Sequence, residues 1–152
     1  MGRDYRGLAE QVYDIFERGA ADELSTVFEP DFIEHDELPG TTATGRELVA
    51  EWLTMSSAAF PDARYAIESI ATTGDEVVVR VRFTGTHRGE FLGIPATGRK
   101  VDVLLMDWVR IGPTDRVAEH WGAMQESKLM AQLGIPQQAT SIDLTVGTPE
   151  RV

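Results

Sequence analysis

The chain has 152 residues, of which 42% are hydrophobic and none is cysteine, a composition that is typical of one globular domain and excludes disulfides and thiolate metal sites. Its formal net charge of −11 opposes binding to nucleic acids and anionic membranes, because both attract clusters of lysine and arginine. No apolar run reaches the roughly 18 residues that cross a bilayer, and the amphipathic, acid-bearing N-terminus is not typical of a signal peptide, so we expect a cytoplasmic protein.

The first third of the chain has the spacing of helices. Apolar residues recur at helical intervals over residues 4–18, and a second short helix is expected over residues 21–28. Thr44 and Glu47 have the T-x-x-E spacing of a capping box, which predicts a third helix over about residues 45–59.

The rest of the chain alternates apolar and polar residues, which is the two-residue period of β-strands. Residues 65–72 and 76–84 flank a Thr-Gly-Asp turn and predict a hairpin. The glycine-rich segment 85–99 predicts a long connection, and residues 100–111 and 116–125 are expected to form two further strands.

Helices followed by antiparallel strands are typical of the α+β class. We therefore expect residues 1–134 to form a single domain, with N-terminal helices packed on a curved, mostly antiparallel sheet. Such a sheet wrapped around a helix encloses a hydrophobic cavity that suits a small molecule. Residues 135–152 are rich in threonine, proline, glycine and glutamine, and we expect an extended tail there.

Asp107 interrupts an apolar row, because Val103, Leu105 and Val109 share its face of the predicted strand. An ionised carboxylate in such a row is costly unless it is paired or hydrogen-bonded. Burial favours the protonated form of a carboxylate, which is how enzymes prepare a general acid or base. Asp107 is therefore a candidate catalytic residue, and a purely structural aspartate is the alternative.

The partner of Asp107 depends on the register of the last two strands. If Ile111 faces Arg116, Asp107 lies opposite His120 and forms a carboxylate–imidazole pair. One residue of slip exchanges the two faces of a strand. Since both faces of the last strand carry apolar residues, the sequence leaves the register open.

The second register needs a bulge. If Ile111 pairs with Val117, Asp107 lies opposite Trp121 and beside Glu119. In that case both of these residues are candidates for binding the substrate.

His35 is a further catalytic candidate, because it leads an acidic turn that is expected to close over the cavity mouth. His87 lies in the glycine-rich connection and is expected at the rim. The histidines show no H-x-H, H-x-x-x-H or H-x-x-E-H spacing, so the sequence predicts no metal site. The aromatic residues that are expected to line the cavity and stack on a flat ligand are Trp52, Phe60, Trp108 and Trp121.

Four segments in series resemble the SnoaL-like polyketide cyclase family, of the nuclear-transport-factor-2-like superfamily: "AFPDARYAIESI", "GTHRGEFLGIPATGRKV", "RVAEHWGAMQ" and "LMAQLG". The resemblance covers about residues 5–134. It implies a cone-shaped α+β barrel around a hydrophobic cavity, no metal or organic cofactor, and dimers or tetramers. It also implies the tailoring of aromatic polyketides in antibiotic pathways, where the best-known members close the fourth anthracycline ring by an intramolecular aldol step.

The sequence departs from the family pattern at Gln125. Cyclase-like relatives read E-H-W-x-x-x-D, and the last aspartate is interpreted as the acid or base. Glutamine cannot exchange a proton at neutral pH, so the chain resembles more closely the branch that hydroxylates anthracycline-type polyketides. That reaction runs without flavin or metal, because an electron-rich phenolate can pass an electron to O₂. Asp107 or His120 is then expected to take the proton, while Gln125 and Trp108 donate hydrogen bonds to the anion.

Three functions are therefore consistent with the sequence. The first is a cofactor-free hydroxylase of a polycyclic phenol or quinone, with or without a separate reductase. The alternative is a polyketide cyclase that uses Asp107 in place of the missing acid, and the third is a non-catalytic ligand-binding or dimerisation domain. Both faces of residues 100–111 are apolar, which predicts a homodimer packed sheet to sheet.

Overall fold

The computed structural model describes residues 3–136, so the tail predicted over residues 135–152 lies almost entirely outside the described part of the chain. Helices come first and strands follow, as the sequence predicts. No helix within the described residues is long and apolar enough to cross a membrane. The elements are α1 (Tyr5–Arg18), the 3₁₀ helix η1 (Ala21–Thr26), β1 (Phe28–Glu34), α2 (Gly45–Ala59), β2 (Arg64–Thr73), β3 (Glu76–Thr86), β4 (Lys100–Ile111), β5 (Val117–Met124) and α3 (Glu126–Gln132).

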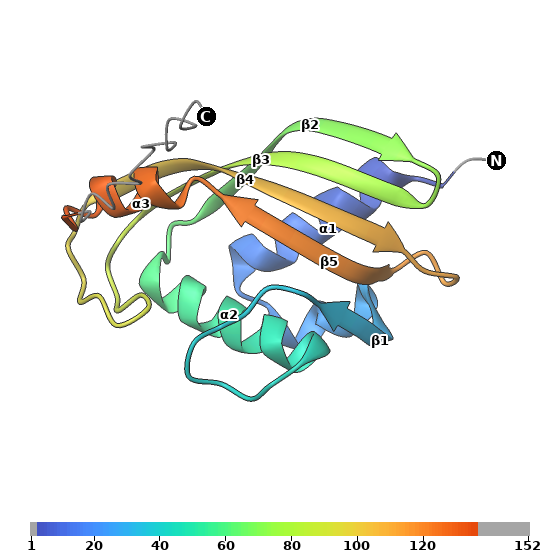
Figure 1. Ribbon diagram of the computed structural model, residues 1–152, viewed down its shortest axis with the longest axis horizontal. Helices are drawn as coiled ribbons and strands as arrows, with labels where there is room; N and C mark the ends of the chain where they lie inside the picture. Colours follow the sequence, from blue (N-terminus) through green and yellow to red (C-terminus); the bar gives the residue numbers. More distant parts are fainter. Residues whose placement is uncertain (1–2, 137–152) are drawn as a thin grey trace, which may run out of the picture.

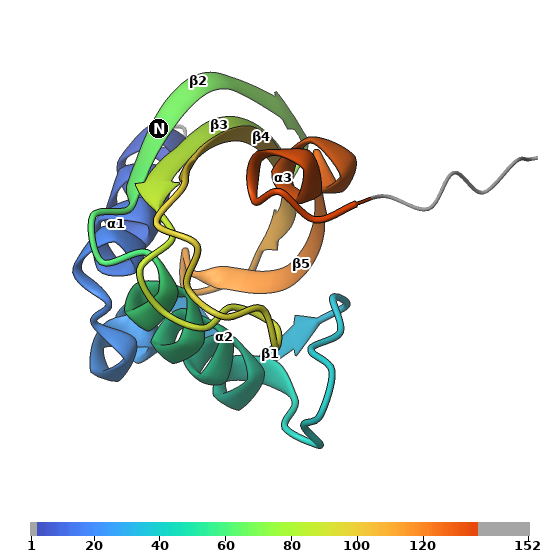
Figure 2. The ribbon, with the colours of Figure 1, turned by 90° about the vertical axis from the view of Figure 1, so that its left-hand side faces the viewer.

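The sheet has five strands in the order β1-β5-β4-β3-β2, and all neighbours are antiparallel except β1 and β5. Helices α1 and α2 pack beneath it (Figure 1). Figure 2 shows that the sheet curls strongly around an interior space, with the two helices closing the remaining side. The predicted α+β fold, a curved sheet under N-terminal helices, is therefore confirmed, although the sheet does not close into a complete barrel.

The helix ends show which local predictions hold. The Asp4 side chain caps α1 by accepting a hydrogen bond from the backbone N–H of Gly7, at 2.8 Å. Thr44 is the N-cap of α2, but its side chain makes no capping hydrogen bond, so the predicted capping box is wrong. The chain enters this helix through Gly45 at a φ of 57°, which differs from the entry that a capping box requires. The second helix is also shorter than predicted, because β1 already begins at Phe28.

The hairpin of β4 and β5 has neither of the two registers considered from the sequence. Ile111 faces Val117, but Arg110 faces Glu119, so Ala118 is an extra, bulged residue. The bulge shifts the rest of the hairpin, so that Asp107 lies opposite Gly122 and His120 opposite Val109. Because Asp107 and His120 are then diagonal neighbours on one face, the predicted carboxylate–imidazole pair still forms.

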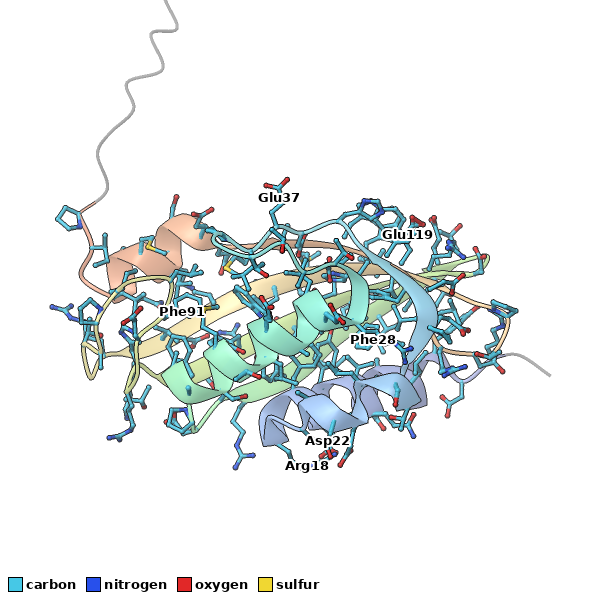
Figure 3. The ribbon with its side chains drawn as sticks, turned by 90° about the horizontal axis from the view of Figure 1, so that it is seen from below. Arg18, Asp22, Phe28, Glu37, Phe91 and Glu119 are labelled. Carbon is cyan, nitrogen blue, oxygen red and sulfur yellow. The ribbon has the colours of Figure 1, made fainter. Side chains whose placement is uncertain are left out.

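Most of the buried side chains in the interior are apolar. Leu53 of α2 and Val81 of β3 are fully buried between the helices and the sheet. Figure 3 labels Phe28 and Phe91, which lie at opposite ends of this interior, and both are buried. Arg18 and Asp22 lie on the outside of the helical layer.

His87 does not lie at a rim as expected from the sequence. Its side chain is fully buried, with 0% of the residue exposed, and its ring packs against Phe60 at 5.4 Å between ring centroids. The Nδ1 atom of His87 pairs with the Thr97 hydroxyl at 2.9 Å. His87 directly follows the last residue of β3, and its backbone pairs with the other end of the glycine-rich connection. Its N–H donates to the Arg99 carbonyl at 2.8 Å, and its carbonyl accepts from the Gly98 N–H at 2.8 Å.

Candidate active site

A cavity of about 740 Å³ lies between the two helices and the concave face of the sheet. This volume is within the range of small-molecule sites. The lining includes the acidic residues Asp36 and Glu37, of which Glu37 is labelled in Figure 3 with its carboxylate directed outward. The apolar lining includes Leu8, Val12, Val49, Val79, Leu105 and Leu129.

Four polar side chains in the cavity wall form a continuous hydrogen-bonded chain, which we call the proton chain. The Tyr13 hydroxyl donates to Asp107 Oδ2 at 2.6 Å. Asp107 Oδ1 lies 2.9 Å from His120 Nε2. His120 Nδ1 lies 2.8 and 3.0 Å from the two carboxylate oxygens of Glu34. The chain therefore runs from α1 through β4 and β5 to β1.

Strand pairing brings these residues together. Glu34 is the register partner of His120 across the parallel β1–β5 pair, so the two side chains lie next to each other on one face. The bulge at Ala118 brings His120 onto the face of Asp107. Tyr13 belongs to the buried side of α1. The proton chain thus depends on the register of the β4–β5 hairpin and on two contacts between segments that are far apart in the sequence, that of Tyr13 with Asp107 and that of Glu34 with His120.

His120 carries a positive charge at neutral pH. Its burial disfavours that charge, but hydrogen bonds to Asp107 and Glu34 outweigh the burial and raise the pKa of His120 to about 10. Both ring nitrogens therefore donate, one to each carboxylate. The imidazolium lies between two acids and fixes the orientation of the Asp107 carboxylate.

Tyr13 keeps its proton and acts as a hydrogen-bond donor. Burial, and after it the neighbouring Asp107 carboxylate, raises the pKa of Tyr13 far above the ordinary value of a phenol. Asp107 thus accepts one hydrogen bond on each oxygen, while its side chain keeps 20% of its surface exposed in the cavity wall. A carboxylate oxygen has room for a second donor, so Asp107 can accept a proton from a bound molecule.

One group of residues within the described part of the chain has the donor set of a metal site. Glu34, Asp36 and His120 each offer one ligand atom, and these atoms lie within 4.8 Å of one another. However, the nitrogen that His120 offers already donates to Glu34. A cation there would have to replace that proton, since a ligating imidazole nitrogen is not protonated.

Two of the predicted aromatic residues line the cavity. Trp52 on α2 packs edge to face against Phe91, with 5.8 Å between ring centroids. Phe60 follows α2 and is buried at the same end. A flat ligand in the cavity would contact both side chains.

The other residues predicted to contact the ligand lie on the outer face of the sheet, so their predicted position in the cavity is wrong. Trp108 and Trp121 face each other across β4 and β5, and they are 45% and 38% exposed. The two-residue period places Trp108 opposite to Asp107, and the bulge places Glu119 and Trp121 on the same outer face. Glu119 pairs there with Arg110 and with His35.

His35 lies at the edge of the cavity, but its ring faces outward. Its Nε2 lies 3.0 Å from Glu119, and its ring stacks on Trp121 at 4.7 Å between centroids. His35 thus belongs to the cavity lining, while its Nε2 atom pairs with Glu119 on the outer face of the sheet.

Gln125 is not among the residues of the cavity wall, where a hydrogen-bond donor to a substrate oxyanion would have to lie. Its side-chain oxygen accepts a hydrogen bond from the backbone N–H of Leu104 at 2.9 Å, and the backbone N–H of Gln125 donates to the Leu104 carbonyl at 3.1 Å. Gln125 is exposed and continues the edge of the β4–β5 ladder as the N-cap of α3. The predicted role of Gln125 is therefore wrong.

Sequence reasoning missed Tyr13 and Glu34. Tyr13 lies four residues after Ala9 on the buried side of α1, and a hydroxyl on an apolar helical face is a readable signal. Glu34 precedes the acidic turn at His35, but only its pairing with His120 gives it a place in the site.

The chain is similar to known proteins of one family. The family model described as SnoaL-like polyketide cyclase matches residues 7–133. The comparison with curated proteins gave no match.

Three solved structures show the same fold. TsrD from Streptomyces laurentii is 27% identical, with a TM-score of 0.78 over 86% of this chain and 95% of that chain. AclR, a presumed hydroxylase from Streptomyces galilaeus, is 25% identical, with a TM-score of 0.72 over 86% and 96%. IdmH, a presumed polyketide cyclase from Streptomyces antibioticus, is 30% identical, with a TM-score of 0.71 over 86% and 98%.

Proposed function

Because the chain belongs to the SnoaL-like polyketide cyclase family, we propose that it hydroxylates a polycyclic phenol or quinone of the anthracycline type without a bound cofactor. The observation that carries this proposal is Asp107, which is held by Tyr13 and His120 in the wall of a mainly apolar cavity. The size of the cavity suits a polycyclic aromatic molecule. The likeness to AclR, a presumed hydroxylase, supports the reaction class.

In the proposed reaction Asp107 accepts the proton of a phenolic hydroxyl and leaves an electron-rich phenolate. The phenolate passes one electron to O₂, and the resulting superoxide and phenoxyl radical combine at a ring carbon, which forms a C–O bond and a ring hydroperoxide. Cleavage of the O–O bond leaves one oxygen atom on the ring, and the other leaves as water. For a reduced quinone the balance is quinol plus O₂ gives hydroxyquinone plus water, so the substrate supplies all the electrons. A separate reductase is needed where the substrate arrives as the quinone. A substrate with a single phenol hydroxyl leaves as the quinone, because phenol plus O₂ gives quinone plus water.

The proton chain orients the Asp107 carboxylate for this reaction. The His120 imidazolium and the Tyr13 hydroxyl hold one oxygen of Asp107 each, so the carboxylate does not need to reorganise when the substrate binds. Glu34 compensates the charge of His120 from the other side. Apolar walls keep water from the phenolate and strengthen its electrostatic interactions.

A polyketide cyclase is the second candidate function, and the likeness to IdmH, a presumed cyclase, supports it. In that reaction Asp107 would remove a proton from a carbon next to a carbonyl. The carbanion would form a C–C bond with a ketone carbon of the same molecule, and the ketone oxygen would take up the proton. The base is the same in both reactions, so the proton chain by itself favours neither.

Purified protein incubated under ¹⁸O₂ tests both candidates, with mass spectrometry of the products. One substrate is a reduced anthraquinone and the other a tricyclic anthraquinone with an uncyclised ketone side chain. One ¹⁸O atom in the first product, above the autoxidation seen without protein, supports hydroxylation. Ring closure of the second substrate without label supports the cyclase. No turnover of either substrate would support a non-catalytic ligand-binding domain. A loss of turnover on addition of EDTA would assign a metal ion to the group formed by Glu34, Asp36 and His120.

A further inference from the structure

Besides the proton chain, the cavity wall carries a second pair of hydroxyl groups, on Tyr65 of β2 and Ser56 of α2. The Tyr65 ring is held by other rings: it stacks on Tyr13 at 5.9 Å between centroids and contacts Phe83 at 5.1 Å. Its backbone N–H donates to Glu17 at 2.9 Å. The position of the Tyr65 hydroxyl is therefore fixed by its surroundings before any ligand arrives.

Among the described residues that line the cavity, four have hydroxyl groups, and they differ in what they already bind. The Tyr5 hydroxyl donates to the backbone carbonyl of Gly74 at 3.0 Å, and the Tyr13 hydroxyl donates to Asp107. The Ser56 hydroxyl donates to the backbone carbonyl of Leu53 at 3.3 Å, and the Tyr65 hydroxyl has this Ser56 hydroxyl as its polar neighbour. Hydroxyl groups rotate, and they both donate and accept hydrogen bonds. Tyr65 can therefore donate a hydrogen bond to a ligand without leaving a buried carboxylate or carbonyl unpaired.

Tyr65 lines the same cavity as Asp107 and stacks on Tyr13, whose hydroxyl donates to the Asp107 carboxylate. Burial, and after it the Asp107 carboxylate, raises the pKa of Tyr65 far above its ordinary value, so this phenol keeps its proton. A molecule that gives up a proton to Asp107 acquires negative charge close to Tyr65. A fixed, protonated donor in an apolar cavity is the arrangement that stabilises such a charge best.

We propose that Tyr65, positioned by Ser56, donates the hydrogen bond that binds and stabilises the substrate oxygen on which negative charge develops when Asp107 removes a proton. This role is the one that the sequence assigned to Gln125, which lies outside the cavity. The inference rests on the proposed proton chemistry at Asp107. It defines the ligand as a planar aromatic molecule whose phenol or enol oxygen reaches Asp107 and Tyr65 together.

Binding of 1,2-dihydroxyanthraquinone tests the inference without turnover, because the visible absorption spectrum of this dye changes when the dye ionises. The wild-type protein is expected to increase the ionisation constant of the bound dye at least tenfold relative to the free dye. Tyr65→Phe removes one oxygen atom and keeps the ring contacts, so it should lose most of that increase. Ser56→Ala should lose a smaller part, as expected of a positioning residue.

Tyr5→Phe is the matched control, because it makes the same atomic change in the same cavity at a hydroxyl that binds Gly74. It should behave like the wild type, and near-UV circular dichroism checks that all variants are folded. Tyr65→Phe should also lower kcat by about 10²–10³-fold with little change in KM.

Equal ionisation of the dye on the wild type and Tyr65→Phe, or no binding of the dye, overturns the inference. Turnover under ¹⁸O₂ is scored separately. A protein with turnover but no effect of Tyr65→Phe therefore disproves this inference alone, whereas an inactive protein that ionises the dye through Tyr65 disproves only the proposed reaction.

Discussion

Raising the pH from 7 to 9 should destabilise this protein through a single residue, His120. The pKa of His120 is about 10 in the folded protein, against 6.5 for a free histidine. Between these two values the folded state holds one proton more than the unfolded state, so stability falls as the pH rises. Below pH 6.5 both states are protonated and the contribution is fully present, and above pH 10 it is lost.

The size of the effect follows from the two pKa values. The slope approaches about 1.4 kcal/mol per pH unit, and the loss between pH 7 and 9 amounts to about 2.5 kcal/mol. This loss is a large fraction of the 5–15 kcal/mol that typically stabilises a folded domain. The His120 side chain is only 18% exposed, so screening by solvent and salt should reduce the effect little.

Urea denaturation followed by tryptophan fluorescence, at several pH values and one protein concentration, measures this slope. His120→Gln should be less stable at pH 7, because Asp107 and Glu34 lose the cation between them, and its stability should vary much less with pH. His35→Gln is the matched control: it removes an exposed histidine that also pairs with a carboxylate, Glu119, and should keep the slope. A flat profile for the wild type, or an unchanged slope in His120→Gln, would refute the charged state of His120.

Three further predictions concern the outer face, the core and the mouth of the cavity. Met106 and Trp108, which are 42% and 45% exposed, are expected to form a sheet-to-sheet homodimer; light scattering should show a dimer for the wild type and a monomer when both are changed to Glu, and a wild-type monomer contradicts this. Leu53→Ala should cost about 2–5 kcal/mol in urea denaturation, because Leu53 is 0% exposed, and a cost below 1 kcal/mol would contradict tight packing. In Gly122→Ala the new Cβ would lie 2.3 Å from Asp36 Oδ2 and 3.0 Å from His120 Cε1, so the Asp36 carboxylate should move away and the His120 ring should shift slightly. Turnover should then fall several-fold with stability kept within about 1 kcal/mol, and unchanged turnover would contradict a dependence of the reaction on the placement of these two side chains.

The sequence predicts the elements well because each is specified by local patterns. The helix over residues 45–59 and the strand over residues 100–111 match the structure, since their apolar periods extend over the whole element. The alternation around Asp107 also identifies the inner face of β4. These predictions need no knowledge of which segments pair.

The rest of the site could not be predicted because it depends on pairing. A single extra residue, Ala118, sets which face carries His120 and which carries Trp121. Both faces of this strand are apolar, so hydrophobicity gives no preference between registers. Tyr13 and Glu34 reach the site from α1 and β1, and their contacts with Asp107 and His120 span 94 and 86 residues of sequence.

Turnover per folded molecule of Asp107→Asn tests most directly whether the cavity performs proton chemistry. The two side chains are nearly isosteric. The asparagine oxygen can accept from His120, and its NH₂ group can donate to the Tyr13 hydroxyl once that hydroxyl turns, so near-UV circular dichroism should show an intact fold. Asparagine cannot take up a proton at neutral pH, and turnover of the reduced anthraquinone should fall by about 10²–10⁴-fold, which is the usual contribution of general acid–base catalysis. Turnover close to that of the wild type in a folded Asp107→Asn protein would contradict the account and leave Asp107 as a structural residue.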